Sequence, residues 1–246
     1  APVISFSTTA IFSSLRKAVP VNQSPTKFGG PADGPGAVTQ DILLPALTTT
    51  TPVTRYDYND YIFRHAMGTD NNISVSGGKD KTKYFASASY LKNEGIIKNT
   101  DHQRYGFRIN LDQVLTDKLN FNIGLNYVNS LSNEKPDGNS FFSPMNSINI
   151  IGNIHDIQTR DALGNIKAIG ERGRVNPVSI IEDIKQNQQT NRIITGGGLK
   201  YRPLEGLLID YSFGIDQYGQ LGQTYIPPFA YNVSDGFFGG GAALDP

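Results

Sequence analysis

Two consecutive segments of this chain alternate strictly between apolar and polar side chains. In the segment 104–112 the odd-numbered positions are Tyr, Phe, Ile and Leu, and the even-numbered positions are charged, amide or Gly residues. The segment 118–128 repeats the pattern as far as Tyr127. A period of two residues indicates β-strands with one apolar and one polar face, and the short run 115–118 between them fits a hairpin turn. This part of the chain therefore predicts an antiparallel sheet.

Similar but less regular patterns predict further strands on both sides of this hairpin. A meander over 71–130 begins with strands at 72–76 and 82–91, which alternate less cleanly. A second hairpin is predicted at 190–216, and its second strand again separates apolar from polar positions. We also expect a strand at 3–12, although its Ser and Thr residues leave its facing ambiguous.

Three long segments lie outside these strands, at 17–59, 131–177 and 217–246, and they are rich in Pro, Gly, Asn or Asp. A short helix is expected at 177–186. Connections this long count against a compact soluble domain. In outer-membrane barrels, long extracellular loops and short periplasmic turns are the expected asymmetry. The loop lengths therefore favour a barrel.

The composition excludes several classes of protein. The chain has no Cys, which rules out a disulfide-stapled scaffold and a thiol catalyst. Its formal net charge is +0, so it has no basic field that would attract nucleic acid. The three His residues are not spaced as paired metal ligands, and no apolar run approaches the roughly 18 residues of a membrane helix. We expect no metal ion, no cofactor and no nucleic-acid partner.

The strand lengths help to decide whether the polar face borders bulk water or the lumen of a barrel. Strands of about 10 residues match the 9–11 that cross a bilayer at a tilt, whereas strands of soluble domains are most often 5–6 residues long. An Arg on the lipid side would cost roughly 2–4 kcal/mol near the midplane, so the polar face should line a lumen. The predicted fold class is all-β, an antiparallel transmembrane β-barrel. The residues expected to face the lumen are Arg104, Arg108, Asn110, Asp112, Asn120, Asn122 and Asn126, and the tyrosines expected at the membrane interfaces are Tyr84, Tyr90, Tyr105, Tyr127 and Tyr201.

Several motifs follow one another in a fixed order. They are Tyr-Ile-Phe-Arg-His-Ala at 61–66, Asn-Asn-Ile-Ser-Val-Ser-Gly-Gly at 71–78, Lys-Thr-Lys-Tyr-Phe-Ala-Ser at 81–87, Glu-Gly-Ile-Ile-Lys-Asn-Thr-Asp at 94–101 and Arg-Tyr at 104–105. This ordered series resembles the SusC/RagA family of TonB-dependent outer-membrane transporters of Bacteroidetes. The later Asn-Pro at 176–177 and Asn-Arg at 191–192 are similar to the next section of the same barrel, so the resemblance covers about 60–216.

The resemblance implies a plugged barrel of about 22 strands, of which this chain would supply a partial set. Neither a plug domain nor a TonB box is found in 1–246, so we expect an internal portion of the barrel domain, or ordered segments joined in one numbering. The family imports oligosaccharides or peptides across the outer membrane of Gram-negative bacteria. Its expected partners are a SusD-like surface lipoprotein, TonB acting through the plug, the lipid bilayer and the substrate. The resemblance implies no catalytic residues.

Aromatic residues in the long segments are candidates for contact with a substrate or partner, although packing of these rings on one another is an alternative for each. These candidates are Phe141, Phe142, Tyr225, Phe229, Tyr231, Phe237 and Phe238. A different reading of the whole chain is a secreted, soluble β-domain that binds carbohydrate or acts as an adhesin. An enzyme is a third class, with Asp57 and Asp60, or Glu182 and Asp183, as acid/base pairs. Surface charges are the simpler explanation, because no recognisable site surrounds either pair.

Overall fold

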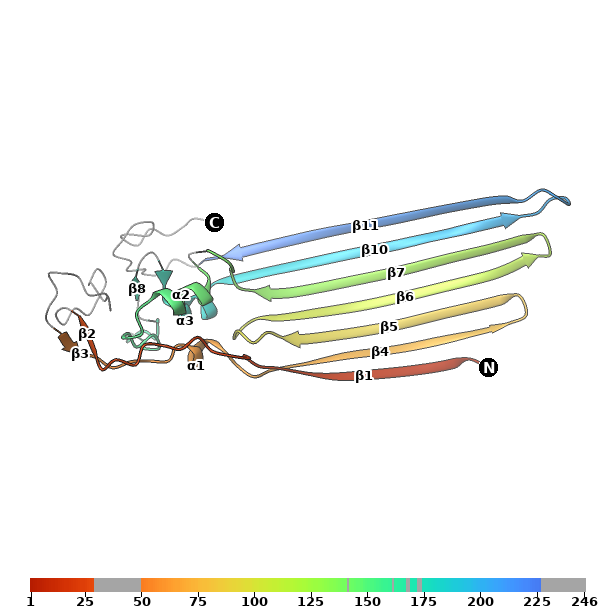
Figure 1. The fold of residues 1–246 in the computed structure, drawn as a ribbon. Coiled ribbons are helices and arrows are strands. Elements are labelled where there is room, and N and C mark those ends of the chain that lie inside the picture. Colours follow the sequence, from red (N-terminus) through yellow and green to blue (C-terminus); the bar gives the residue numbers. More distant parts are fainter. Residues whose placement is uncertain (29–49, 141, 161, 167–168, 172–173, 227–246) are drawn as a thin grey trace.

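Seven long strands form one antiparallel sheet in the order β1-β4-β5-β6-β7-β10-β11 (Figure 1). The computed structural model describes residues 1–28, 50–140, 142–160, 162–166, 169–171 and 174–226. Each strand pairs with its neighbours in antiparallel register, which confirms the predicted all-β, antiparallel class. The strands are β1 (Val3–Ser13), β4 (Ala66–Lys79), β5 (Thr82–Glu94), β6 (Asp101–Thr116), β7 (Leu119–Glu134), β10 (Lys185–Tyr201) and β11 (Ile209–Tyr225).

The strands are longer than the alternating pattern predicts. β7 continues to Glu134 and β11 to Tyr225, into stretches that the sequence assigns to loops. In these extensions both faces of the strand carry mostly polar residues, so the period of two disappears from the sequence. The backbone pairing nevertheless continues across Glu134, Gln186 and Thr224 on three neighbouring strands.

The two ends of the sheet differ in the length of their connections (Figure 1). At one end β4 and β5 are joined by Asp80 and Lys81, β6 and β7 by Asp117 and Lys118, and β10 and β11 by residues 202–208. Asp80 has a φ of 50°, which a tight hairpin turn requires. The described residues of the long connections 14–65 and 135–184 lie at the other end, together with the β5–β6 loop. This arrangement confirms the predicted alternation of short turns and long loops within the described residues.

Three short helices lie at the end of the sheet that carries the long loops. They are α1 (Asn59–Ile62), α2 (Pro144–Ile150) and α3 (Pro177–Glu182). Ser143 caps α2 by accepting a hydrogen bond from the Asn146 amide, and Asn176 caps α3 in the same way from Val178. The helix predicted at 177–186 is confirmed in its first part, and its last residues belong instead to β10. Among the described residues, none of the helices has the length and apolar character needed to span a membrane.

Apart from Ala66 at the start of β4, the buried side chains of the described residues lie among the loops and not on the seven-stranded sheet. One cluster contains Tyr58, Ile151, Ile157 and Val178, and a second contains Phe142, Val175, Ile180 and Ile184. Two short strand pairs complete this region: β2 (Thr26–Phe28) with β3 (Thr50–Pro52), and β8 (Gly170–Glu171) with β9 (Arg174–Val175). The loop end is therefore packed around cores of its own.

Candidate functional site

One face of the sheet is polar across its central strands. The pairs Arg108–Asn126 and Asp112–Asn122 lie directly opposite each other on β6 and β7, so their side chains share that face. The same register places together all seven residues predicted to face a lumen: Arg104, Arg108, Asn110, Asp112, Asn120, Asn122 and Asn126. The sequence correctly grouped them. That this face borders a lumen stays a prediction.

The opposite face carries a continuous apolar band. One row of register partners crosses the sheet from Phe6 on β1 to Ile193 on β10, and the next row crosses it from Ile4 to Ile215 on β11. In the middle of the band Phe107 is 41% exposed and Ile109 is 38% exposed. No described part of the chain covers these side chains, so the band is available to an apolar environment.

A row of aromatic and amide side chains bounds the apolar band on the side of the long loops. The ring centroids of Tyr90 and Tyr105 lie 5.0 Å apart. Further along the row, the Asn191 Oδ1 atom accepts hydrogen bonds from the Tyr127 hydroxyl at 3.1 Å and from Asn129 Nδ2 at 2.6 Å. Aromatic girdles of this kind flank the apolar band of transmembrane barrels. The five tyrosines predicted at interfaces all share this face by register.

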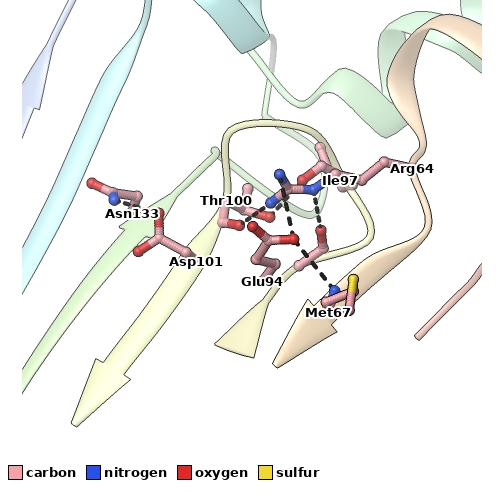
Figure 2. Close-up of polar contacts among 8 residues, drawn as sticks. Arg64, Met67, Glu94, Ile97, Thr100, Asp101 and Asn133 are labelled. Carbon is pink, nitrogen blue, oxygen red and sulfur yellow. Dashed lines mark hydrogen bonds and ion pairs between the residues drawn. The ribbon is translucent and has the colours of Figure 1, made fainter. Parts of the chain in front are cut away.

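Arg64 fastens the β5–β6 loop to the segment that enters β4 (Figure 2). Its Nε atom donates to the Gly95 carbonyl oxygen at 3.0 Å, and its Nη2 atom donates to the Thr100 carbonyl oxygen at 2.8 Å. Its Nη1 atom lies 3.8 Å from Glu94 Oε2, which also accepts from the Met67 amide. Four residues of the motifs that carry the family resemblance thus hold the β5–β6 loop in place: Arg64, Glu94, Gly95 and Thr100.

Replacing Arg64 by Met should loosen the β5–β6 loop while the sheet stays intact. The variant leaves two carbonyl oxygens and one carboxylate without their cation, a loss of about 1.5–3 kcal/mol of local stability. Hydrogen exchange measured by mass spectrometry on the assembled receptor should speed up at 95–100 and stay unchanged in β6. Arg160→Met is the control, because the Arg160–Glu182 ion pair is exposed and exposed ion pairs contribute little to stability. Unchanged exchange at 95–100 would contradict a clamp.

Two further contacts tie the loops together, and the residue pattern predicts the partner in neither of them. Asn99 adopts a φ of 58°, and its Nδ2 atom donates to the Ile181 carbonyl oxygen of α3 at 3.2 Å. Arg55 Nη1 donates to Asn153 Oδ1 at 2.9 Å, which joins two long connections. These residues act through tertiary contacts with distant segments, so only the structure identifies them.

Lys135, with Asp183 nearby, joins the two ends of the long β7–β10 connection. Lys135 follows β7 directly, and its Nζ atom donates to the carbonyl oxygen of Ile184, which precedes β10. Burial lowers the pKa of Lys135, and the nearby Asp183 opposes that shift. Burial also raises the pKa of Asp183, and the neighbouring Glu182 adds to the shift. Asp183 therefore lies at the base of this loop and interacts electrostatically with Lys135.

The predicted contact aromatics have different outcomes. Phe142 is 9% exposed and packs in the cluster with Val175, Ile180 and Ile184, so its ring serves loop packing. Tyr225 ends β11 and is 51% exposed, on the side of the long loops. Phe141, Phe229, Tyr231, Phe237 and Phe238 lie outside the described residues. Contact of any of these aromatics with a substrate or partner stays a prediction.

The described residues include no group of three or more His, Cys, Asp or Glu side chains that could hold a metal ion. Two cations on the polar face are instead paired with a carboxylate on the neighbouring strand. Arg192 Nε donates to Asp216 Oδ1 at 2.8 Å, and Lys200 Nζ lies 3.3 Å from Asp210 Oδ2. This face is a polar, charged surface.

Curated relatives are similar to one part of the chain. The receptor named TonB-dependent receptor SusC, from Bacteroides thetaiotaomicron, is 35% identical over 74 residues, which are 30% of this chain and 7% of that protein. TonB-dependent receptor P26 from Formosa agariphila is 34% identical over 71 residues, or 29% of this chain and 7% of the relative. These similarities support a partial SusC/RagA-type TonB-dependent receptor. No protein-family model matches it.

Solved structures share the fold of this chain, residues 1–246, which is called the receptor segment below. The RagAB peptide importer in its open-open state superposes with a TM-score of 0.64 at 18% identity, covering 94% of this chain and 29% of the other. The closed-closed state gives a TM-score of 0.55 at 18% identity, covering 74% of this chain and 21% of the other. The receptor segment therefore spans under a third of these chains, and its sheet matches part of their β-barrel.

Proposed function

We propose that residues 1–246 form part of the barrel domain of an outer-membrane nutrient importer of SusC type. The observation that carries the proposal is the division of one seven-stranded sheet into an apolar face and a polar face, with long loops at one end and short turns at the other. In this arrangement the apolar face contacts lipid and the polar face borders the import path. The long loops then lie on the extracellular side.

The proposed cargo is an oligosaccharide or a peptide, taken up together with a SusD-like lipoprotein. Support comes from the similarity to SusC and from the fold shared with the RagAB peptide importer. TonB would act through a plug domain supplied by polypeptide outside these residues. The role of the chain would be transport and not catalysis, because the relatives carry the names of receptors and importers.

The soluble β-domain is the weaker candidate because of the exposed apolar band. A water-soluble protein would expose side chains such as Phe6, Phe107 and Ile215 to solvent in a continuous patch. It would also leave both outer strands of the sheet, β1 and β11, with unpaired backbone groups. A barrel embedded in lipid removes both problems.

The experiment that tests the proposal is purification of the native polypeptide from membranes with detergent, followed by intact-mass measurement. We expect a mass several times the 26.8 kDa of these residues, and a co-purifying lipoprotein. Deletion of the encoding gene should abolish uptake of at least one oligosaccharide or peptide by the host. A water-soluble monomer recovered without detergent would refute the transporter and favour the secreted β-domain.

A further inference from the structure

Two arginines stand close together on the polar face of β6, the central strand of the sheet. Arg104 and Arg108 are both exposed, and only Gly106 separates them on that face. At about 3.3 Å per residue their Cα atoms lie about 13 Å apart, and both side chains are long and flexible. Because Gly106 has no side chain, no side chain of β6 itself stands between the two arginines on this face.

The described strands place no carboxylate directly beside either arginine. The positions directly opposite them on β5 and β7 are uncharged: Leu91, Ser130, Ser87 and Asn126. The nearest acidic positions on the face are Asp112, four residues along β6, and Asp70, two strands from Arg104. Within the described part of the chain, neither arginine has a hydrogen-bond or ion-pair partner.

Two other cations on the same face have a carboxylate partner. Arg192 is paired with Asp216, and Lys200 is paired with Asp210, in both cases across β10 and β11. Arg104 and Arg108 instead keep two positive charges without a carboxylate beside them, so this part of the face attracts anions. The contrast on one face therefore points to an anion supplied from outside the sheet.

A third polar group borders the same space. Gly106 is paired with Ser89 on β5, and a Cβ atom at position 106 would collide with the Ser89 hydroxyl oxygen. The Ser89 hydroxyl thus leans over the Gly106 backbone, between the levels of the two arginines. Two guanidinium groups and one hydroxyl can donate to the same small anion, and the guanidinium fork is matched to a carboxylate. We call this space, formed by Ser89, Arg104, Gly106 and Arg108, the Gly106 gap.

We propose that the Gly106 gap binds a carboxylate of the imported substrate. This inference rests on the proposed function, in which the polar face borders the import path. Arg104 lies three residues from Asp101, the loop end of β6, so the gap is in the outer part of the face, beneath the long loops. A substrate that enters from the loop side meets the gap early. The substrate class is then acidic: a peptide rich in Asp or Glu, or an oligosaccharide that contains uronic acids.

The test measures binding of short probes to the full-length receptor purified with its lipoprotein. The acidic probes are a poly-glutamate peptide and a galacturonate oligosaccharide, and the neutral probes are the matching poly-glutamine peptide and galactose oligosaccharide. We expect the wild type to prefer at least one acidic probe over its neutral counterpart. Arg108→Gln and Arg104→Gln should each weaken that binding by about 10-fold or more, because each removes a charge-assisted hydrogen-bond donor. Which probe responds identifies a peptide or a glycan.

Two further variants keep the test decisive. Lys200→Gln removes one cation from the same face but away from the gap, and it should leave acidic-probe binding unchanged. Arg108→Lys keeps the charge and loses the fork, so it should weaken binding less than Arg108→Gln and guards against a folding defect. Barrel assembly of every variant is checked by its migration on gels before and after heating.

Two results would overturn the inference. The first is equal affinity of the wild type for acidic and neutral probes. The second is unchanged affinity in both glutamine variants. If those variants also lose thermal stability, the arginines are assigned to carboxylates of the plug domain. A receptor that imports a neutral nutrient normally and shows any of these results refutes the acidic substrate and leaves the proposed function intact. A receptor that imports nothing refutes the proposed function itself.

Discussion

Ile109→Arg is expected to prevent assembly of the receptor in the outer membrane, whereas Asn110→Arg at the next position is expected to be tolerated. Ile109 lies in the middle of the apolar band, and Asn110 lies on the polar face of the same strand. Near the midplane an Arg facing lipid costs roughly 2–4 kcal/mol, while an Arg on the polar face stays hydrated. The measurement is the amount of heat-modifiable, folded receptor in outer-membrane fractions.

A third variant turns this comparison into a depth series. Tyr105 lies on the same face as Ile109 but in the aromatic row that bounds the band. Tyr105→Arg should therefore cost only about 0–1 kcal/mol, the value near an interface, and should assemble at close to the normal level. Equal assembly of the Ile109→Arg and Asn110→Arg receptors would show that the apolar face does not contact lipid.

The orientation of the sheet predicts an all-or-none labelling result. Leu163 is 87% exposed at the end that carries the long loops, and the Asp117 side chain is 96% exposed in the short turn between β6 and β7. Residues 1–246 contain no native Cys, so each introduced cysteine is the only thiol within them. On intact cells a membrane-impermeant maleimide should label Leu163→Cys and fail to label Asp117→Cys.

The control for the labelling experiment is the same reagent applied after the outer membrane has been permeabilised. Asp117→Cys should then react as completely as Leu163→Cys, which excludes a buried thiol as the cause of its protection. Labelling of Asp117→Cys on intact cells, with protection of Leu163→Cys, would reverse the orientation. The long loops would then face the periplasm, and entry of substrate from the loop side would be ruled out.

The sheet was predictable because its two faces carry different kinds of side chain. Where apolar and polar residues alternate strictly, as at Phe107 and Arg108, each residue type indicates its face, and the positions and pairing of β6 and β7 follow from the sequence. The signal fades where both faces are polar, which is why the ends of β7 and β11 were assigned to loops. The strand at 3–12 was expected with an ambiguous facing, and pairing of Phe6 with Ile73 fixes it.

The loop contacts were much harder to predict. Arg64 lies inside a recognisable motif, but its hydrogen bonds go to the carbonyl oxygens of Gly95 and Thr100. Every residue has a backbone carbonyl, so the residue types do not reveal which ones accept. α2 was missed because a helix this short has little periodicity and is held by the cap at Ser143 and by packing. The polar set on the sheet was grouped correctly, but its unpaired arginines could be recognised only once the register showed which residues lie beside them.

The order of the strands has a consequence for biogenesis. Each strand of the sheet lies beside the long strand that immediately precedes it in the chain, and none is inserted between two earlier ones. A polypeptide with this topology can be added to a growing sheet from one edge, in the order of synthesis, with each new strand templated by the last. No completed strand pairing has to be broken when a new strand is added. Because neighbouring strands are consecutive long strands of the chain, their contacts are close in sequence except where a long loop separates them. The sheet can thus enter the bilayer progressively, one hairpin after another.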